Sequence, residues 1–136
     1  MLTIRYVLPE DKEFWYRLDK HLPEQEFANK VCGKSGYVLL DGNTPIGLLR
    51  YSLFWDSIPF CNMLYIDGNY QRKGYGKKLM AYWEAEMKTK GYVRLLTSTQ
   101  ADEEAQHFYR KLGYQDCGGF VLDVPGPMEL VRIKTI

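Results

Sequence analysis

The sequence predicts a mixed α/β fold, with a central sheet that carries helices on its faces. Short runs rich in β-forming residues alternate with amphipathic helical segments, and glycine and proline mark most of the boundaries between them. The expected order of elements is β-α-α-β-β-β-α-β-α-β-β, with no internal repeat, linker or low-complexity tract. A chain of 136 residues can bury one core and is too short for two. We therefore expect residues 1–136 to form a single domain.

The chain is expected to begin with a strand and two helices. Residues 2–8 alternate apolar and polar side chains, which is typical of a strand. Pro9 suits the first turn of a helix, and the acidic residues after it complement the helix dipole. An apolar stripe continues this helix to about residue 20, and a second short helix is expected over residues 23–32.

A hairpin and a further strand are predicted next. Two β-rich runs, residues 37–40 and 46–55, are joined by a turn that contains Gly and Asn. We expect a second turn at residues 56–59 and a strand over residues 60–66.

The second half of the chain predicts two more helices. Apolar side chains recur at intervals of three and four over residues 75–90, which indicates a long amphipathic helix. Residues 93–97 predict a strand. Ser98 or Thr99 is expected to cap the helix that follows, and Gly113 to end it. The chain is then expected to finish in two strands, residues 120–124 and 128–133.

Composition and charge limit the function classes. Apolar residues make up 46% of the chain and charged residues 26%, which excludes wholesale disorder. A net charge of +1 gives no general attraction to nucleic acid or to anionic membranes. No run approaches the ~18 apolar residues of a membrane span, and the N-terminus lacks the apolar centre of a signal peptide. We therefore expect a cytoplasmic protein with neither a nucleic-acid nor a membrane partner.

The cysteines indicate a reduced protein without a metal site. Cys32, Cys61 and Cys117 are odd in number, widely spaced and form no C-x-x-C pair. His21 and His107 are the only histidines, so a closed zinc site is not expected. We expect the three cysteines to be small buried apolar residues.

The most informative segment is residues 71–78, QRKGYGKK, which opens the long helix. Its four cations crowd the end of the helix that already carries partial positive charge. Two glycines allow close approach of a ligand to the main chain, and the first amides of a helix lack partners within it. Together these features predict a bound phosphate or pyrophosphate, and so a phosphorylated cofactor. The four cations are Arg72, Lys73, Lys77 and Lys78.

Three glycine-loop motifs compete for this segment. A Walker A loop fails because Gly76-Lys77 is followed by Lys78 and not by Ser or Thr. A dinucleotide fingerprint is a poor match because Leu79 stands where a third glycine belongs. The remaining pattern is Q/R-x-x-G-x-G/A, set after the apolar strand 64–67 and followed by a helix, a strand and the run A-x-x-F-Y-x-x-x-G-Y at residues 105–114.

In this order and spacing the chain resembles the GNAT superfamily of acyl-CoA-dependent N-acetyltransferases. The resemblance implies a mostly antiparallel central sheet of about six to seven strands with helices on both faces. It also implies acetyl-CoA as co-substrate, no metal, and Tyr109 as the acid that protonates the departing thiolate. The strand 64–66 would pair with the pantetheine arm and the loop amides would hold the pyrophosphate. The cofactor residues that it implies are Leu64, Tyr65, Ile66, Gln71, Arg72, Lys73, Gly74, Tyr75, Gly76, Lys77 and Asp102.

Two departures from the family pattern concern the chemistry. The family often has Asn where this chain has Asp102, and carboxylates that serve as base align with Asn62 and Thr97. The sequence therefore names no general base. A neutral amine can attack a thioester directly in a ternary complex, so no enzyme nucleophile is required, and no G-x-S-x-G elbow is present.

The expected partners are acetyl-CoA and a small-molecule or peptide amine, and a homodimer is compatible with the sequence. Phe54 or Trp55 is a candidate wall of the acceptor pocket, since neighbouring strand residues face opposite ways. The alternative function is a non-catalytic acyl-CoA-binding sensor or interaction module, which the absence of a base at Asn62 and Thr97 favours. RNA binding through the loop cations is the weaker alternative, because no wider basic surface surrounds them.

Overall fold

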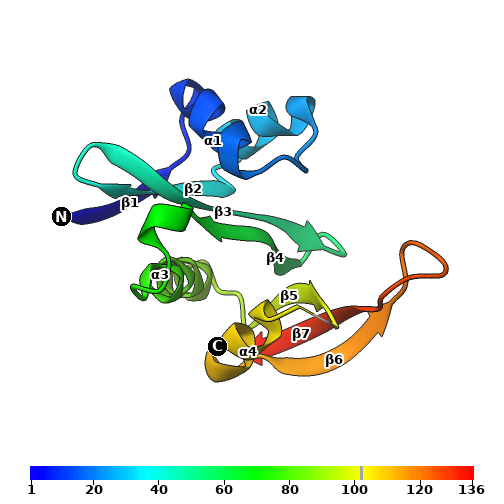
Figure 1. Cartoon of the computed structure of the whole chain (residues 1–136). Coiled ribbons are helices and arrows are strands. Elements are labelled where there is room, and N and C mark those ends of the chain that lie inside the picture. The colour runs from blue at the N-terminus through cyan, green and yellow to red at the C-terminus, as the bar shows by residue number, and fades with distance from the viewer. Residues whose placement is uncertain (102) are drawn as a thin grey trace.

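The computed structural model of the chain describes residues 1–101 and 103–136 and shows a seven-stranded sheet with helices on both faces (Figure 1). The strand order is β1-β2-β3-β4-β5-β7-β6. The strands are β1 (Leu2–Tyr6), β2 (Gly36–Asp41), β3 (Thr44–Phe54), β4 (Ile58–Ile66), β5 (Arg94–Gln100), β6 (Gln115–Phe120) and β7 (Glu129–Thr135).

Two pairs of helices cover the sheet from opposite sides. The helices α1 (Lys12–Leu18) and α2 (Glu24–Cys32) lie together on one face, and α3 (Tyr75–Thr89) lies on the other face, as does α4 (Ala105–Lys111) (Figure 1). Trp15 anchors the core under the first pair. The larger core forms under α3 and α4, because the long helix buries its whole apolar stripe there, namely Leu79, Met80, Trp83 and Met87.

The centre of the sheet contains its single parallel strand pair among the described residues, β4 with β5. Their pairing is confined to Phe60 opposite Leu96 and Cys61 opposite Thr97. Beyond Cys61 the strand β4 continues to Ile66 without β5 beside it, so its backbone groups on that side lack a strand partner. A gap therefore opens in the middle of the sheet, next to the start of α3.

One half of the sheet is covered by helices on a single face. Among the described residues no helix packs on the side of β5, β7 and β6 that faces away from α4 (Figure 1). All six residues of β6 are exposed, as expected for an edge strand on an uncovered half-sheet. This uncovered face lies directly beside the gap between β4 and β5.

The mixed α/β fold and the element order predicted from the sequence are confirmed, and three local predictions are wrong. The strand expected over residues 120–124 lies earlier in the chain, because residues Gln115–Phe120 pair with β7 and the chain leaves the sheet after Phe120. Ile58 and Pro59 form the start of β4 and not part of a turn, because proline is tolerated where β4 has no β5 partner. Neither Ser98 nor Thr99 caps a helix, since both pair with β7 in the sheet and α4 begins at Ala105.

The cysteines also differ from the expectation. Cys61 is buried, but Cys32 and Cys117 are exposed, and all three are free thiols. Within the described ranges, no helix is long and apolar enough to cross a membrane. In the same residues, no group of three His, Cys, Asp or Glu side chains gathers in a way that could hold a metal ion.

Candidate functional site

The glycine loop delivers the chain from β4 into α3 with a left-handed turn. Gly74 precedes the helix with a φ of 80°, and Arg72 also has a positive φ, of 64°. The first helical hydrogen bond runs from the N–H of Lys78 to the carbonyl of Gly74, at 3.2 Å. The N–H groups of Tyr75, Gly76 and Lys77 therefore have no acceptor within the helix. These three donors point out of the helix start, as an anion site requires.

The cations of the loop are available to a ligand. Arg72, Lys73, Lys77 and Lys78 are all exposed, and none forms an ion pair with a described residue. Arg72 and Lys73 precede the helix and do not belong to its first turn, because α3 begins at Tyr75. The first turn contains no acidic residue that could neutralise Lys77 and Lys78.

A side-chain contact fixes the loop to the end of β4. The amide nitrogen Nε2 of Gln71 donates to the carbonyl of Ile66 at 2.8 Å. On the far side, a Cβ added to Gly76 would lie 3.5 Å from the ring of Phe108 on α4. The loop is thus held between β4, which precedes it, and α4, which follows later in the chain.

A cavity of about 450 Å³ lies between the loop, β4 and α4. Its walls include the unpartnered amides of the helix start and loop cations, a donor set that fits a pyrophosphate. They also include the open edge of β4, which fits a chain that bears amide groups. Lys73 does not line it, since its ammonium lies over the ring of Tyr70, 5.8 Å from the centroid. Asp102 lies outside the described residues. The sequence-predicted residues that line the cavity are Leu64, Tyr65, Ile66, Gln71, Arg72, Gly74, Tyr75, Gly76, Lys77 and Tyr109.

Tyr109 is a buried side chain of α4, only 7% exposed. Its ring packs edge-on against those of Phe108 and Tyr114. Burial raises the pKa of Tyr109 above its ordinary value, the nearby Cys61 thiol adds to this rise, and a hydrogen bond with Thr97 opposes it. The phenol therefore remains protonated at neutral pH and can donate a hydrogen bond.

A second cavity, of about 650 Å³, adjoins the first. The two share Leu64, Ala105 and Tyr109 in their walls, so Tyr109 stands at the boundary between them. Unlike the first, the second cavity is lined by charged and titratable groups of both signs. These are His21, Arg50, Glu103 and Glu129.

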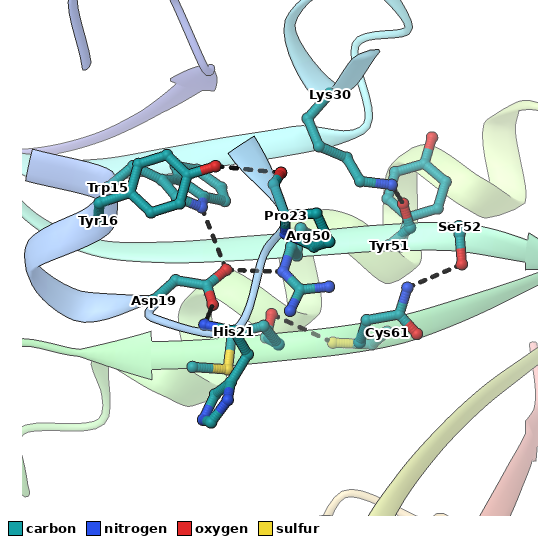
Figure 2. A network of polar contacts seen from close by, with 12 residues as sticks. Trp15, Tyr16, Asp19, His21, Pro23, Lys30, Arg50, Tyr51, Ser52 and Cys61 are labelled. Carbon is teal, nitrogen blue, oxygen red and sulfur yellow. Dashed lines mark hydrogen bonds and ion pairs between the residues drawn. The ribbon is translucent and has the colours of Figure 1, made fainter. Parts of the chain in front are cut away.

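A buried polar network positions two of these groups (Figure 2). The Asp19 carboxylate is 0% exposed and accepts from Nε of Arg50 at 2.7 Å, from Nε1 of Trp15 at 3.1 Å and from the N–H of His21 at 3.1 Å. Figure 2 shows the Arg50 guanidinium extending from this carboxylate toward β4. The network therefore fastens the segment after α1 to the middle of β3, beside the second cavity.

The two positions that align with a family base hold neutral side chains with structural partners. The amide of Asn62 donates to Oγ of Ser52 at 2.7 Å. The hydroxyl of Thr97 donates to the carbonyl of Cys61 at 3.1 Å, across the parallel pairing. Neither side chain can accept a proton from an ammonium, so a base must come from another residue or from water.

A third cavity, of about 720 Å³, continues from the second along the uncovered face of the sheet. The two share Phe60, Asn62 and Phe120. Phe54 and Trp55, expected to border the acceptor pocket, line this third cavity and not the second. Their rings lie close together, with centroids 4.7 Å apart.

Sequence reasoning did not identify the charged residues of the second cavity. They come from separate segments, and no motif or periodic pattern joins them. Glu103 alone has a local signal, since it lies in the short segment that joins β5 to α4, the helix that carries Tyr109.

Comparisons with solved structures show close likeness of fold. Ard1 from Thermoplasma volcanium has a TM-score of 0.88 and 17% identity, with 99% of this chain and 97% of that chain covered. The ribosomal-protein-S18-alanine N-acetyltransferase from Escherichia coli has a TM-score of 0.83 and 19% identity, with coverages of 100% and 94%. Naa50 from Arabidopsis thaliana, in complex with the bisubstrate analogue CoA-Ac-MVNAL, has a TM-score of 0.81 and 13% identity, with 99% of each chain covered.

The sequence itself gives the family. No curated protein matches the chain significantly. A family profile described as the acetyltransferase (GNAT) family matches residues 4–114, which contain β2 to β5, the glycine loop and Tyr109. The chain therefore belongs to the acetyltransferase (GNAT) family and is an acyl-CoA-dependent N-acetyltransferase.

Proposed function

We propose that the protein transfers an acetyl group from acetyl-CoA to a primary amine by direct attack in a ternary complex. The observation that carries this proposal is the position of Tyr109 in the wall shared by the first two cavities. One cavity suits a phosphorylated cofactor, and the other offers carboxylates to a cationic amine. Reaction at their boundary requires both substrates to be bound at once.

The first cavity is the proposed acetyl-CoA site. The N–H groups of Tyr75, Gly76 and Lys77 would hold the pyrophosphate, with Arg72 and Lys77 side chains adding charge. The unpaired edge of β4 beyond Cys61 would pair with the pantetheine arm. When bound, acetyl-CoA supplies an activated acyl group and a thiolate leaving group.

Proton transfers are assigned to residues at the boundary. The neutral amine forms the new C–N bond and the C–S bond breaks. The proton that the nitrogen then loses reaches the departing thiolate, whose thiol has an ordinary pKa of about 8.5, through the hydroxyl of Tyr109. The proton lost by the ammonium passes to the second cavity, where Glu103, Glu129 and His21 are the groups able to accept it. These residues replace the carboxylate that Asn62 and Thr97 cannot provide.

We infer a cytoplasmic location from the free thiols. Two of the three unpaired cysteines are exposed, and such thiols persist in a reducing compartment. The loop cations are assigned to the cofactor phosphates and not to RNA, because the net charge of the chain is only +1.

The test is thiol release from acetyl-CoA in the presence of a panel of amines and peptides, together with calorimetric binding of CoA. We expect CoA binding and acceptor-dependent thiol release. CoA binding with no transfer to any acceptor would favour the sensor alternative. Absence of CoA binding would remove the proposed cofactor site altogether.

A further inference from the structure

We propose that the acceptor is the N-terminal α-amine of a polypeptide whose next residues are apolar, with the amine in the second cavity and the following side chains in the third. This inference rests on the proposed acetyl transfer and names its substrate class. It is drawn from the way in which charge and apolar surface are distributed along two connected cavities.

The two cavities form one continuous path away from Tyr109. The second cavity begins at Tyr109 and ends at Phe60, Asn62 and Phe120, and the same three residues begin the third. Each cavity falls within the range of ~300–1,000 Å³ that is typical of small-molecule sites, whereas the two taken together exceed it. The path therefore suits a longer acceptor than a single metabolite.

Charge is confined to the end of the path near Tyr109. Glu103 and Glu129 line the second cavity, and neither carboxylate forms an ion pair with a described residue. Both carboxylates therefore keep an uncompensated charge that attracts an ammonium group, while Oε1 of Glu103 also accepts from the N–H of Gln100 at 3.1 Å. The residues that line the third cavity, all within the described ranges, include no charged side chain. An acceptor that fits this gradient has a cationic head and an uncharged apolar continuation.

Arg50 distinguishes a polypeptide from a simple apolar amine. Its Nε is committed to Asp19, which fixes the guanidinium in place, while the group as a whole lines the second cavity. An α-amine at the start of a polypeptide has a peptide carbonyl two bonds away, and a guanidinium N–H can donate to that oxygen. A plain alkylamine offers no such acceptor. The carboxylates and Arg50 therefore match the two ends of one aminoacyl unit.

The apolar walls of the third cavity are exposed and unpartnered. Trp55 is 80% exposed and Phe120 44% exposed, on the tips of two hairpins that flank the uncovered half-sheet. Large exposed aromatic side chains of this kind mark binding surfaces, and aromatic residues contribute most to such contacts. Continuity with the acceptor cavity identifies the occupant as the remainder of the acceptor.

The experiment compares matched acceptors with the full-length enzyme. Two hexapeptides share the same first residue and differ at positions two to four, which are Leu-Phe-Leu in one and Ser-Gln-Ser in the other. We expect kcat/KM to be about 10- to 100-fold higher for the apolar peptide, as expected for burial of one or two side chains. Glycinamide and phenethylamine complete the panel. Glycinamide has the amine and the carbonyl but no apolar continuation, and phenethylamine has an apolar continuation but no carbonyl.

Two substitutions test whether the preference for the apolar peptide arises in the third cavity. Trp55→Ser and Phe120→Ser should each lower the ratio of kcat/KM for the two peptides by about tenfold. Val93→Ser, which replaces another exposed apolar side chain outside all three cavities, should leave that ratio unchanged. Circular dichroism of each variant checks that the fold is retained.

The outcomes separate this inference from the proposed function. Thiol release with glycinamide but no preference between the peptides would overturn the inference alone, as would a better rate with phenethylamine than with the apolar peptide. A dimer that dissociates in the Trp55→Ser variant, seen by sedimentation velocity, would assign the groove to a second copy of the chain. Failure of every amine to release thiol would overturn the proposed function and this inference with it.

Discussion

At the scale of single residues, Tyr109 combines burial with a position in the walls of both the first and the second cavity. Its hydroxyl remains protonated because burial raises its pKa, and the Cys61 thiol beside it has its pKa raised to about 12 by the same desolvation. Both neighbours are therefore neutral at physiological pH. A neutral phenol in a low-dielectric wall is a hydrogen-bond donor suited to a developing thiolate.

Replacement of Tyr109 by Phe should lower kcat by about 100-fold, since general-acid contributions are typically of this order or larger. The affinity for CoA should change little, because the hydroxyl is expected to act on the sulfur of the departing thiol. Steady-state kinetics with calorimetry measures both quantities. Tyr82→Phe, on the exposed face of α3, is the control. Unchanged turnover in Tyr109→Phe at saturating substrate would exclude the residue from the mechanism.

Asp19 has an equally local role in stability. It is the buried anion between Arg50 and Trp15, and Arg50 in turn lowers the pKa of the buried Lys30, which burial lowers more strongly. Lys30 itself donates to the carbonyl of Tyr51 at 2.9 Å. Without the Asp19 charge, two buried cations would remain near each other with no compensating anion.

We expect Asp19→Asn to destabilise the fold by about 3 kcal/mol, the usual effect of removing one partner of a buried pair. Urea denaturation measures this change. Asp41→Asn is the matched control, because Asp41 pairs with the N-terminus at 3.4 Å on the surface, where such a pair contributes at most about 1 kcal/mol. Equal effects of the two substitutions would contradict the role given to the network.

At the scale of elements, the start of α3 assigns different roles to its two glycines. Gly74 has a positive φ, but a Cβ there would meet no atom within 4 Å. Gly76 has ordinary helical geometry, and its Cβ would approach Phe108 and Leu64, which line the first cavity. The first glycine is thus required by the backbone, and the second by the space that it leaves for a ligand.

This difference predicts opposite results for two alanine substitutions. Gly74→Ala should cost about 1–2 kcal/mol of stability, because an L-residue is strained at that φ. Gly76→Ala should leave stability unchanged or slightly higher, since alanine favours helices, and should weaken CoA binding by about tenfold or more. Thermal unfolding and calorimetry measure the two effects. Full CoA affinity in Gly76→Ala would show that the main chain there does not approach the cofactor.

At the scale of the whole molecule, four buried tyrosines link stability to alkaline pH. Burial is the largest cause that raises the pKa of each, and the hydroxyls of Tyr37 and Tyr114 also donate to Glu86 and Glu84. Tyr51 reaches a pKa of about 12. In the unfolded chain all four would titrate near the ordinary value of about 10. The fourth is Tyr109.

The free energy of unfolding should therefore be insensitive to these groups below about pH 10 and fall above it, because the unfolded chain then releases protons that the native state retains. Each tyrosine contributes a slope of about 1.4 kcal/mol per pH unit. Urea denaturation between about pH 8 and about pH 11.5, a range around the ordinary tyrosine pKa of about 10, measures the slope of the free energy of unfolding against pH. Tyr51→Phe should reduce this slope by the contribution of one tyrosine, and an unaltered slope would contradict the linkage.

The sequence predicts the frame of the molecule better than the lining of its second cavity. Amphipathic period and turn residues determine where α3 lies, and a spaced motif joins the glycine loop to Tyr109, so local pattern suffices for both. The charged pair Glu103 and Glu129 meets only because β5 and β7 are neighbours, a tertiary relation that no local pattern encodes. The prediction of a turn at Pro59 is wrong for the same reason, because its position in β4 depends on the absence of a β5 residue beside it.

The edge position of β6 affects how such a molecule can diversify. This strand pairs with β7 and with no other described strand, and it carries Phe120, which lines the third cavity. Changes within the β6–β7 hairpin can therefore accumulate in a lineage without disturbing the proposed acetyl-CoA site. Grafting that hairpin from one relative onto another should transfer the preference for a particular acceptor with it.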